Sequence, residues 1–389
     1  MPKMFNIAGP CIPGEHYLVP ALARLPQLGR LIAAKQFFVI HAARQSGKTT
    51  LLKALARDLT RKDTHVALYC SLETAQGIAE AEKGIPAVIH ALLNGLTWHP
   101  FFKNLPPPTV NLSAYTVAVN SLLSQLAHAT GKPLVVLFDE ADCLSGPTLI
   151  SFLSQLRDGY VNRIRSPFPV SLALVGMRNI RDYKAKGRPD SDTLGSASPF
   201  NIVTEALTLT NFTREEIVAL YQQHTVETGQ VFEAAAIDRA SYWTCGQPWL
   251  VNALARECVE KLLKHDYTQP VTAELIDAAA EVLLCRRDTH LDSLLERLKE
   301  PRVRRMVEPV ILGTEPVEST LSDDGQYVLD LGLLKREDRT LKPANPLYAE
   351  VILRALSYDT QESMGRSIVA APWIPGDGLD MTGMLHAFQ

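Results

Sequence analysis

The sequence predicts an α/β protein with a doubly wound parallel-sheet core, followed by an α-helical domain and a winged-helix domain. An apolar run ends in a Gly-Lys-Thr loop, a second apolar run ends in two acids, and strands alternate with helices to about residue 210. That alternation is typical of a parallel sheet covered by helices. Past residue 210 the predicted strands stop and helical patterns take over.

The first apolar run is residues 37–40, and it leads into the loop at residues 42–49, Ala-Ala-Arg-Gln-Ser-Gly-Lys-Thr. A helix with leucines on one face follows, so the loop has the strand–loop–helix context of a P-loop. Such a loop holds a nucleoside triphosphate with backbone N–H groups, one lysine and one hydroxyl that binds magnesium. We therefore expect ATP and Mg²⁺ as cofactors, with Lys48 at the phosphates and Thr49 at the metal. The loop residues expected to bind the cofactor are Arg44, Gln45, Ser46, Gly47, Lys48, Thr49 and Thr50.

The loop lacks its usual first glycine, because Ala42 stands there. Alanine can replace that glycine only where φ stays negative. Gly47 and Lys48 still occupy the positions nearest the phosphates. The alternative, a chance Gly-Lys-Thr at the end of a buried strand, is disfavoured by the second half of the site.

The second apolar run is residues 134–138, and Asp139 and Glu140 follow it directly. Five apolar residues in a row suit a strand buried on both faces, and ligands bind at the carboxyl edge of such sheets. We expect Asp139 to hold the water shell of magnesium and Glu140 to orient or deprotonate an attacking water. Asp139, Glu140 and Lys48 are thus the candidate catalytic residues. The alternative is that the two acids only cap the next helix.

Further strands are predicted at residues 65–72, 170–175 and 206–209. The strand at 170–175 runs into Gly-Met-Arg-Asn, so Arg178 or Asn179 is a candidate sensor of the γ-phosphate. A surface arginine and a turn asparagine are the alternative for this pair.

The composition fits a multidomain protein without a strong net electrostatic field. The chain has 389 residues and a net charge of −3, which suggests two or three domains and no general attraction to nucleic acid or anionic membranes. It contains no apolar run of about 18 residues and no signal-peptide core at its start. Its six cysteines have no metal-ligand spacing. We expect a cytoplasmic protein without a membrane partner.

The region after residue 210 divides into two helical parts. Thr213 and Glu216 form a predicted capping box, and the helices that follow are broken at Gly246-Gln247-Pro248. In helical lid domains such a corner can lie against the base, so Pro248 is a candidate cofactor-binding residue. An ordinary helix–helix turn is the alternative.

Residues 301–357 show two helices, two short strands and a helix that Asn345 caps, which is typical of a winged helix. The expected recognition helix carries Asp323, Asp324 and Asp330 but no lysine or arginine, so packing on a partner or another domain is favoured over reading DNA. A basic cluster precedes it. We expect its members to form local ion pairs on a solvated face, with nucleic-acid contact or an arginine for a neighbouring ATP site as alternatives. The cluster comprises Arg297, Lys299, Arg302, Arg304 and Arg305.

Several segments together resemble the bacterial AAA-like P-loop ATPases, in the STAND and archaeal-ATPase branch of the ASCE class. These segments are 8–17, 44–50, 138–142, 246–252 and 345–348. The resemblance implies a core at 1–210 with an N-terminal adenine-side segment, a helical lid at 211–298, a winged helix at 299–358 and a tail at 359–389. It also implies that His16 and Tyr17 lie near the adenine; a simple brace over the sheet edge is the alternative. Some relatives carry a C-terminal PD-(D/E)XK nuclease-like domain, which we do not expect here because residues after 357 lack the needed carboxylates and lysine.

The resemblance implies an ATP-hydrolysing molecular switch, whose nucleotide state controls the lid, the winged helix and contacts with a protein partner or a second copy. The alternative is an AAA+-type DNA-engaging loader, or a transposition or defence regulator, that binds duplex DNA as an ATP-bound oligomer. A scaffold that barely hydrolyses is disfavoured, because Asp139 and Glu140 are both present.

Overall fold

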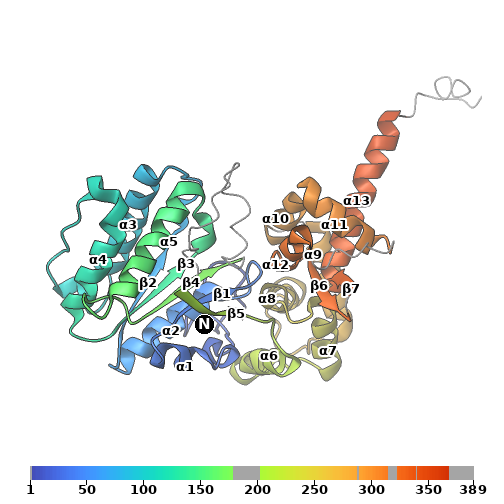
Figure 1. Cartoon of the computed structure of the whole chain (residues 1–389). Helices are drawn as coiled ribbons and strands as arrows, with labels where there is room; N and C mark the ends of the chain where they lie inside the picture. The colour runs from blue at the N-terminus through green and yellow to red at the C-terminus, as the bar shows by residue number, and fades with distance from the viewer. Residues whose placement is uncertain (1, 178–201, 287–288, 314–321, 339, 368–389) are drawn as a thin grey trace, which may run out of the picture.

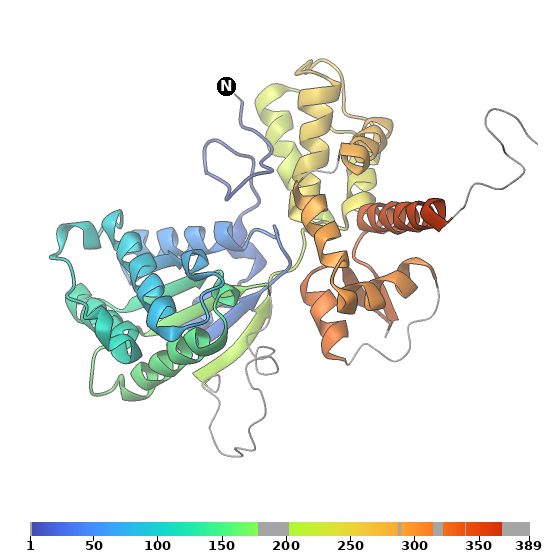
Figure 2. The same ribbon diagram turned by 90° about the horizontal axis from the view of Figure 1, so that it is seen from above.

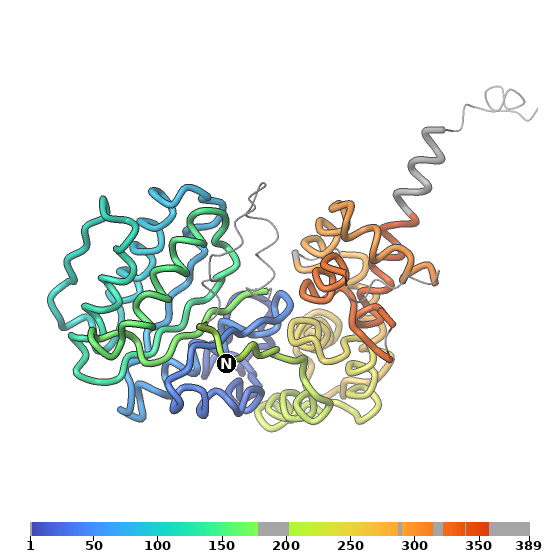
Figure 3. The backbone as a smooth tube through the Cα atoms, viewed as in Figure 1, coloured from blue at the N-terminus to red at the C-terminus, as the bar shows by residue number. Residues whose placement is uncertain are grey.

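The computed structural model describes residues 2–177, 202–286, 289–313, 322–338 and 340–367. A parallel sheet with its helices forms one part, and the helices from α6 (Arg214–Thr228) to α13 (Pro346–Ser367) form a second part beside it (Figure 1). The chain passes from the sheet to the second part between β5 (Val203–Thr208) and α6, as the tube in Figure 3 shows.

The sheet has five parallel strands in the order β2-β3-β4-β1-β5, so the parallel core predicted from the sequence is confirmed. The first strand in the chain lies between the fourth and the fifth. This order places the loops after β1 and β3 at the same carboxyl edge, on either side of β4. The remaining strands are β1 (Phe37–His41), β2 (Val66–Ser71), β3 (Leu134–Asp139) and β4 (Ser171–Gly176).

Strands β1 to β4 are mostly apolar and buried because helices cover both faces of the sheet, whereas alternate residues of the edge strand β5 are exposed. Successive side chains point to opposite faces, so Phe37 and Val39 join one buried cluster while Phe38 and Ile40 join the other. Helices α3, α4 and α5 pack in the first cluster, and α1 and α2 pack in the second. Their bounds are α1 (Leu28–Ala33), α2 (Lys48–Arg61), α3 (Ala81–Thr97), α4 (Tyr115–Thr130) and α5 (Gly146–Asn162).

The second part begins with the predicted capping box. The Glu216 N–H donates to Thr213 Oγ1 at 3.2 Å, and the Thr213 N–H donates to Glu216 Oε2 at 2.8 Å. Four helices follow, the third of which runs on into a π-helical stretch at residues 257–262. They are α6, α7 (Ala234–Thr244), α8 (Pro248–Arg256) and α9 (Ala273–Arg286).

The C-terminal elements follow the predicted order of two helices, two short strands and a capped helix. The strands pair antiparallel, and the Tyr348 N–H donates to Asn345 Oδ1 at 2.8 Å at the start of α13. The elements before α13 are α10 (Thr289–Leu298), α11 (Pro301–Ile311), α12 (Asp323–Asp330), β6 (Leu334–Glu337) and β7 (Thr340–Pro343).

One buried cluster runs through α6 to α13, and it includes Phe5 and Tyr17 from the N-terminal segment. This segment therefore packs on the helical part (Figure 2), although the sequence grouped it with the sheet. Within the described ranges, no helix has the length and apolar character needed to cross a bilayer.

Candidate nucleotide-binding site

The loop between β1 and α2 has P-loop geometry. Gln45 and Gly47 have positive φ values of 58° and 93°, whereas Ala42 does not, so the condition for alanine at the first position is met. Lys48 begins α2 and is only 8% exposed. Its Nζ donates to the carbonyl oxygens of Ala42 and Ala43, each at 2.8 Å. Burial lowers the pKa of Lys48, and the carboxylates around it oppose that shift.

A hydroxyl and a carboxylate meet beside the lysine. Thr49 Oγ1 donates to Asp139 Oδ2 at 2.6 Å, and Tyr69 Oη donates to the same oxygen at 3.1 Å. The sequence analysis did not single out Tyr69, because a tyrosine within a strand carries no motif. Among the described residues no group of three or more histidines, cysteines or acids could hold a metal ion. Mg²⁺ characteristically takes one or two protein oxygens and completes its shell with phosphate and water, so Thr49 and Asp139 fit it.

Glu140 follows Asp139 at the carboxyl end of β3 and has a left-handed φ of 56°. Its side chain makes no capping hydrogen bond to the short helix at residues 141–143, so the capping alternative is not what the structure shows. Burial raises the pKa of Glu140, and the charges of Asp139 and Asp142 raise it further. A carboxylate with a raised pKa is better matched to accepting a proton from water near neutral pH.

Asp142 is a site residue that the sequence analysis missed. It is the charge that most strongly opposes the lowered pKa of Lys48, and its Oδ2 accepts a hydrogen bond from the Met177 N–H at 3.1 Å. Asp142 therefore joins the ends of β3 and β4 beside the P-loop. The signal was present as the third acid of the segment 139–142. Arg178 and Asn179, the candidate sensors, lie outside the described residues.

A cavity of about 680 Å³ opens between the P-loop, the end of β3, the N-terminal segment and α8. This volume lies within the range of small-molecule sites. Ser46, Asp139 and His16 do not line it: Ser46 is 2% exposed, Asp139 contacts Thr49, and His16 accepts a hydrogen bond from the Ile12 N–H. The predicted residues that do line it are Tyr17, Arg44, Gln45, Gly47, Lys48, Thr49, Thr50, Glu140 and Pro248.

Comparison with known proteins agrees with this geometry. Residues 32–183, which contain the P-loop, Asp139 and Glu140, match the AAA domain family. This part of the chain therefore resembles an AAA domain, and the match covers less than half of the whole sequence. Among curated proteins none matches the sequence.

Solved structures resemble this protein over most of its length. A Walker-type ATPase of Pyrococcus abyssi superposes with a TM-score of 0.60 at 16% identity, covering 90% of this chain and 99% of that one. The ORC2 protein of Aeropyrum pernix gives a TM-score of 0.49 at 14% identity, covering 88% and 94%. Cdc6p from Pyrobaculum aerophilum gives 0.48 at 13%, covering 90% and 97%. The first of these likenesses shows that the two proteins share a fold over most of this chain.

Most of the Tyr17 ring packs into the aromatic cluster of the helical part. The ring is 1% exposed, its centroid lies 4.9 Å from that of Phe5, and its hydroxyl meets His224 Nδ1 at 3.1 Å. Tyr17 also lines the larger cavity, so its expected place near the adenine stays a prediction. The alternative, a brace over the sheet edge, differs from the structure in that the segment packs on the helical part.

The Gly-Gln-Pro corner lies directly against the P-loop. Gln247 Nε2 approaches the carbonyl oxygens of Arg44 and Gln45 at 3.5 Å, while its Oε1 accepts from the Leu250 N–H at 2.6 Å and caps α8. Trp249 Nε1 donates to the Ile7 carbonyl at 2.8 Å and so ties α8 to the N-terminal segment. The sequence analysis gave Gln247 and Trp249 no role of their own beyond the helix break and the resembling segment 246–252. Their roles depend on contacts with distant residues.

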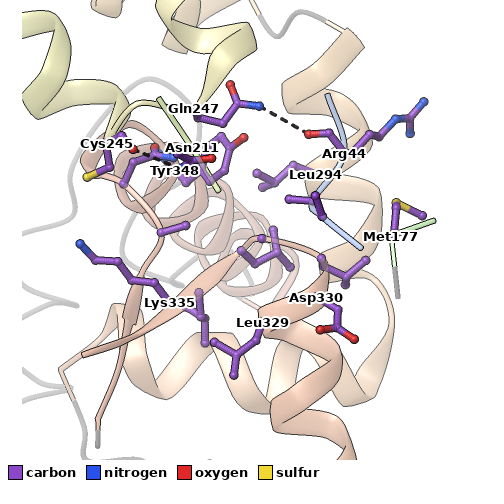
Figure 4. A pocket seen from close by; sticks show the side chains of 18 of the residues that line it. Arg44, Met177, Asn211, Cys245, Gln247, Leu294, Leu329, Asp330, Lys335 and Tyr348 are labelled. Carbon is purple, nitrogen blue, oxygen red and sulfur yellow. Dashed lines mark hydrogen bonds between the residues drawn. The ribbon is translucent and has the colours of Figure 1, made fainter. Parts of the chain in front are cut away.

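A second cavity, of about 540 Å³, lies on the other side of the P-loop (Figure 4). It adjoins the first cavity, since Arg44, Met177 and Arg297 line both. Arg44 donates to Ser293 Oγ on α10, and Gly332, with a φ of 73°, approaches Ala43 so closely that a Cβ atom there would collide with it. The C-terminal elements of the protein thus contact the P-loop itself.

Helix α12 faces this second cavity with part of its surface. Asp330 is 7% exposed and accepts a hydrogen bond from Gln326 at 2.8 Å, so it is not available to face DNA. The interdomain packing favoured from its acidity agrees with this placement. The basic cluster also follows the expectation of local ion pairs, which are Arg297–Glu300, Lys299–Glu296, Arg302–Glu300, Arg304–Glu308 and Arg305–Asp324.

Proposed function

We propose that this protein binds ATP with Mg²⁺ in the larger cavity and hydrolyses it. The contact between Thr49 and Asp139 at 2.6 Å carries this proposal, because it brings the P-loop hydroxyl to the acid of β3, as a magnesium site requires. Lys48 lies in the same loop and serves as the cation for the phosphates. Bound Mg²⁺ would neutralise charge on the phosphate oxygens.

Glu140 is the proposed general base. Its carboxylate lines the cavity, and its raised pKa favours uptake of a proton from an attacking water. Asp142 acts through its neighbours: it holds the Met177 backbone and adds negative charge beside Lys48. Lys48 binds phosphate by exchanging the carbonyl oxygens of Ala42 and Ala43 for phosphate oxygens.

Nucleotide state is proposed to control the position of the helical parts. The helices of 211–298 serve as a lid, and the elements of 299–358 as a winged helix that packs on the P-loop rather than on DNA. Three contacts support this coupling, since Gln247, Ser293 and Gly332 all meet residues 43–45 of the loop. A loop that rearranges around a phosphate would change all three, and the released surface would meet a protein partner or a second copy.

The DNA-loading alternative has no specific support among the described residues. Helix α12 buries Asp330, and the basic cluster before it is paired with nearby acids. Phosphate binding would have to replace these ion pairs.

The test is the turnover of ATP by a Glu140→Gln variant, measured beside binding of a fluorescent ATP analogue. Removal of a general base costs about 10²- to 10⁴-fold in rate. We therefore expect turnover to fall at least about a hundredfold while binding is retained. Glu80→Gln is a matched control, because Glu80 is exposed and pairs with the exposed Lys83. Unchanged turnover in Glu140→Gln would remove Glu140 from the reaction, and loss of binding would make its role structural.

A further inference from the structure

The carboxylate of Asp139 lies behind the wall of the larger cavity. Thr49 lines that cavity, whereas Asp139 does not and is only 1% exposed. A buried charge is costly unless hydrogen bonds compensate it. Within the described part of the chain, three groups donate to this carboxylate: the Glu140 N–H to Oδ1 at 3.0 Å, and the Thr49 and Tyr69 hydroxyls to Oδ2 at 2.6 and 3.1 Å. Of these donors, Tyr69 is the one that belongs to neither nucleotide-binding motif.

Tyr69 is held between the sheet and helix α2. Its strand β2 pairs with β3 so that Ser71 lies opposite Asp139, which places the Tyr69 side chain on the same face of the sheet as that carboxylate. On the other side, Lys53 Nζ lies 5.2 Å from the centroid of the Tyr69 ring, which is a cation–π contact. Lys53 follows Thr49 by one turn of α2, so one face of this helix meets both the carboxylate and the ring.

These contacts determine how the Thr49 hydroxyl is oriented. An ionised carboxylate can only accept hydrogen bonds, so the hydrogen of the Thr49 hydroxyl points at Asp139. Its oxygen lone pairs are then left for a cation in the cavity that Thr49 lines. Mg²⁺ demands near-ideal octahedral geometry, so a small turn of this hydroxyl weakens its binding. The position of Oδ2 sets that turn, and Tyr69 is the second donor that fixes Oδ2.

We propose that Tyr69 is a positioning residue of the magnesium site: its hydroxyl fixes Oδ2 of Asp139, which in turn orients the Thr49 hydroxyl towards the metal. This inference rests on the proposed function, because it concerns the Mg²⁺ that accompanies ATP in the larger cavity. Tyr69 acts through Asp139 and does not itself line the cavity. Removing an outer-shell partner of this kind typically costs about 10- to 100-fold in metal affinity or activity.

The first experiment measures how strongly Mg²⁺ supports nucleotide binding. Dissociation constants of adenylyl imidodiphosphate, a non-hydrolysable ATP analogue, are determined by calorimetry with excess Mg²⁺ and with EDTA. The variant is Tyr69→Phe, which keeps the ring and its contact with Lys53. We expect its affinity with Mg²⁺ to fall about tenfold and its affinity in EDTA to stay within about twofold of wild type. An equal loss under both conditions, or no loss under either, would overturn the inference.

Tyr160→Phe is the matched control. The Tyr160 ring packs on Phe37, at 4.8 Å between centroids, and Phe37 begins β1 at the end of the strand away from the P-loop. We expect wild-type affinity for the analogue with Mg²⁺ and with EDTA. A tenfold loss with Mg²⁺ in this variant too would mean that the loss in Tyr69→Phe is not specific to the contact with Asp139.

The second experiment follows ATP turnover as free Mg²⁺ is varied. In Tyr69→Phe we expect the half-saturating concentration of Mg²⁺ to rise about tenfold, while turnover at saturating Mg²⁺ returns to within about threefold of wild type. A purely structural role would instead lower the melting temperature and leave the half-saturating Mg²⁺ unchanged. That result, or a fall in turnover that Mg²⁺ does not restore, contradicts the inference.

The outcomes separate this inference from the proposed function. Wild-type protein that binds the analogue equally well with Mg²⁺ and with EDTA contradicts the magnesium site, and the role of Tyr69 with it. Wild-type protein that depends on Mg²⁺, beside a Tyr69→Phe variant that depends on it to the same degree, contradicts only the role of Tyr69.

Discussion

The two sides of the nucleotide cavity are built differently. On the P-loop side, Lys48, Asp139, Glu140 and Asp142 are charged residues in two short sequence motifs. On the α8 side, Trp249 and its neighbours are neutral and are positioned by contacts with the N-terminal segment. A phosphate chain must be met by charge, whereas a base can be met by shape and a few hydrogen bonds. The first requirement leaves a signature in sequence, and the second can be satisfied by many residue combinations.

This difference implies that the two sides respond unequally to substitution. Charged groups in a buried site act strongly, because little water screens them. Neutral contacts are each worth about 0.5–1.5 kcal/mol. We therefore expect large losses on the P-loop side and small ones on the α8 side, and three measurements test that order.

Lys48→Ala should have the largest effect. It removes the cation that lies beside three carboxylates, and the phosphates would then meet uncompensated negative charge. We expect ATP affinity to fall by more than about a hundredfold, since a charge-assisted contact is worth about 1.5–3 kcal/mol and repulsion adds to it. Binding of a fluorescent ATP analogue measures this. Lys62→Ala is the control, because Lys62 is exposed and pairs with Asp58. Wild-type affinity in Lys48→Ala would remove the basis for a phosphate site here.

The fall of kcat/KM at low pH should be the next largest effect. Only deprotonated Glu140 can act as a base, and its pKa is raised above that of an ordinary glutamate, about 4.3. Activity should therefore be complete above the raised pKa and fall about tenfold per pH unit below it. The titration of ATP is common to both proteins, so it cancels in the ratio of wild type to Glu140→Gln. A ratio that does not change with pH would contradict the assignment.

Trp249→Phe should have the smallest effect. Phenylalanine retains an aromatic wall but cannot donate to the Ile7 carbonyl, so the N-terminal segment loses its 2.8 Å tie to α8. We expect ADP affinity to fall about three- to tenfold, with little change in turnover at saturating ATP. Titration of ADP by calorimetry gives the first value and a steady-state assay the second. A loss of nucleotide affinity as large as that of Lys48→Ala would contradict the expectation that the α8 side contributes less than the P-loop side.

Local patterns predicted local structure well. The five strands lie where apolar runs placed them, the capping box at Thr213 and the cap at Asn345 are formed, and Ala42 keeps the negative φ that its side chain requires. Each depends on residues close together in sequence, where side-chain size, alternation and hydrogen-bonding groups act directly on the backbone.

Features that depend on distant contacts could not be read from the sequence alone. Tyr17 was expected near the adenine; it lines the larger cavity, while most of its ring packs with Phe5 and His224. Tyr69 was not singled out, because a tyrosine in a strand looks ordinary until its neighbours are known. Asp330 was expected on a helix that packs on a partner or another domain, and its own burial is visible only in the structure.

By itself, the sequence determined that this protein has a parallel α/β core and a phosphate loop, because both are encoded in contiguous residues whose periodicity and charge act locally. Only the tertiary structure decided which residues enclose the rest of the cavity. Trp249 meets Ile7 across 242 positions of the chain, and Arg44 meets Ser293 across 249. Contacts over such separations depend on how the sheet and the helical part pack together, and no short segment carries that information.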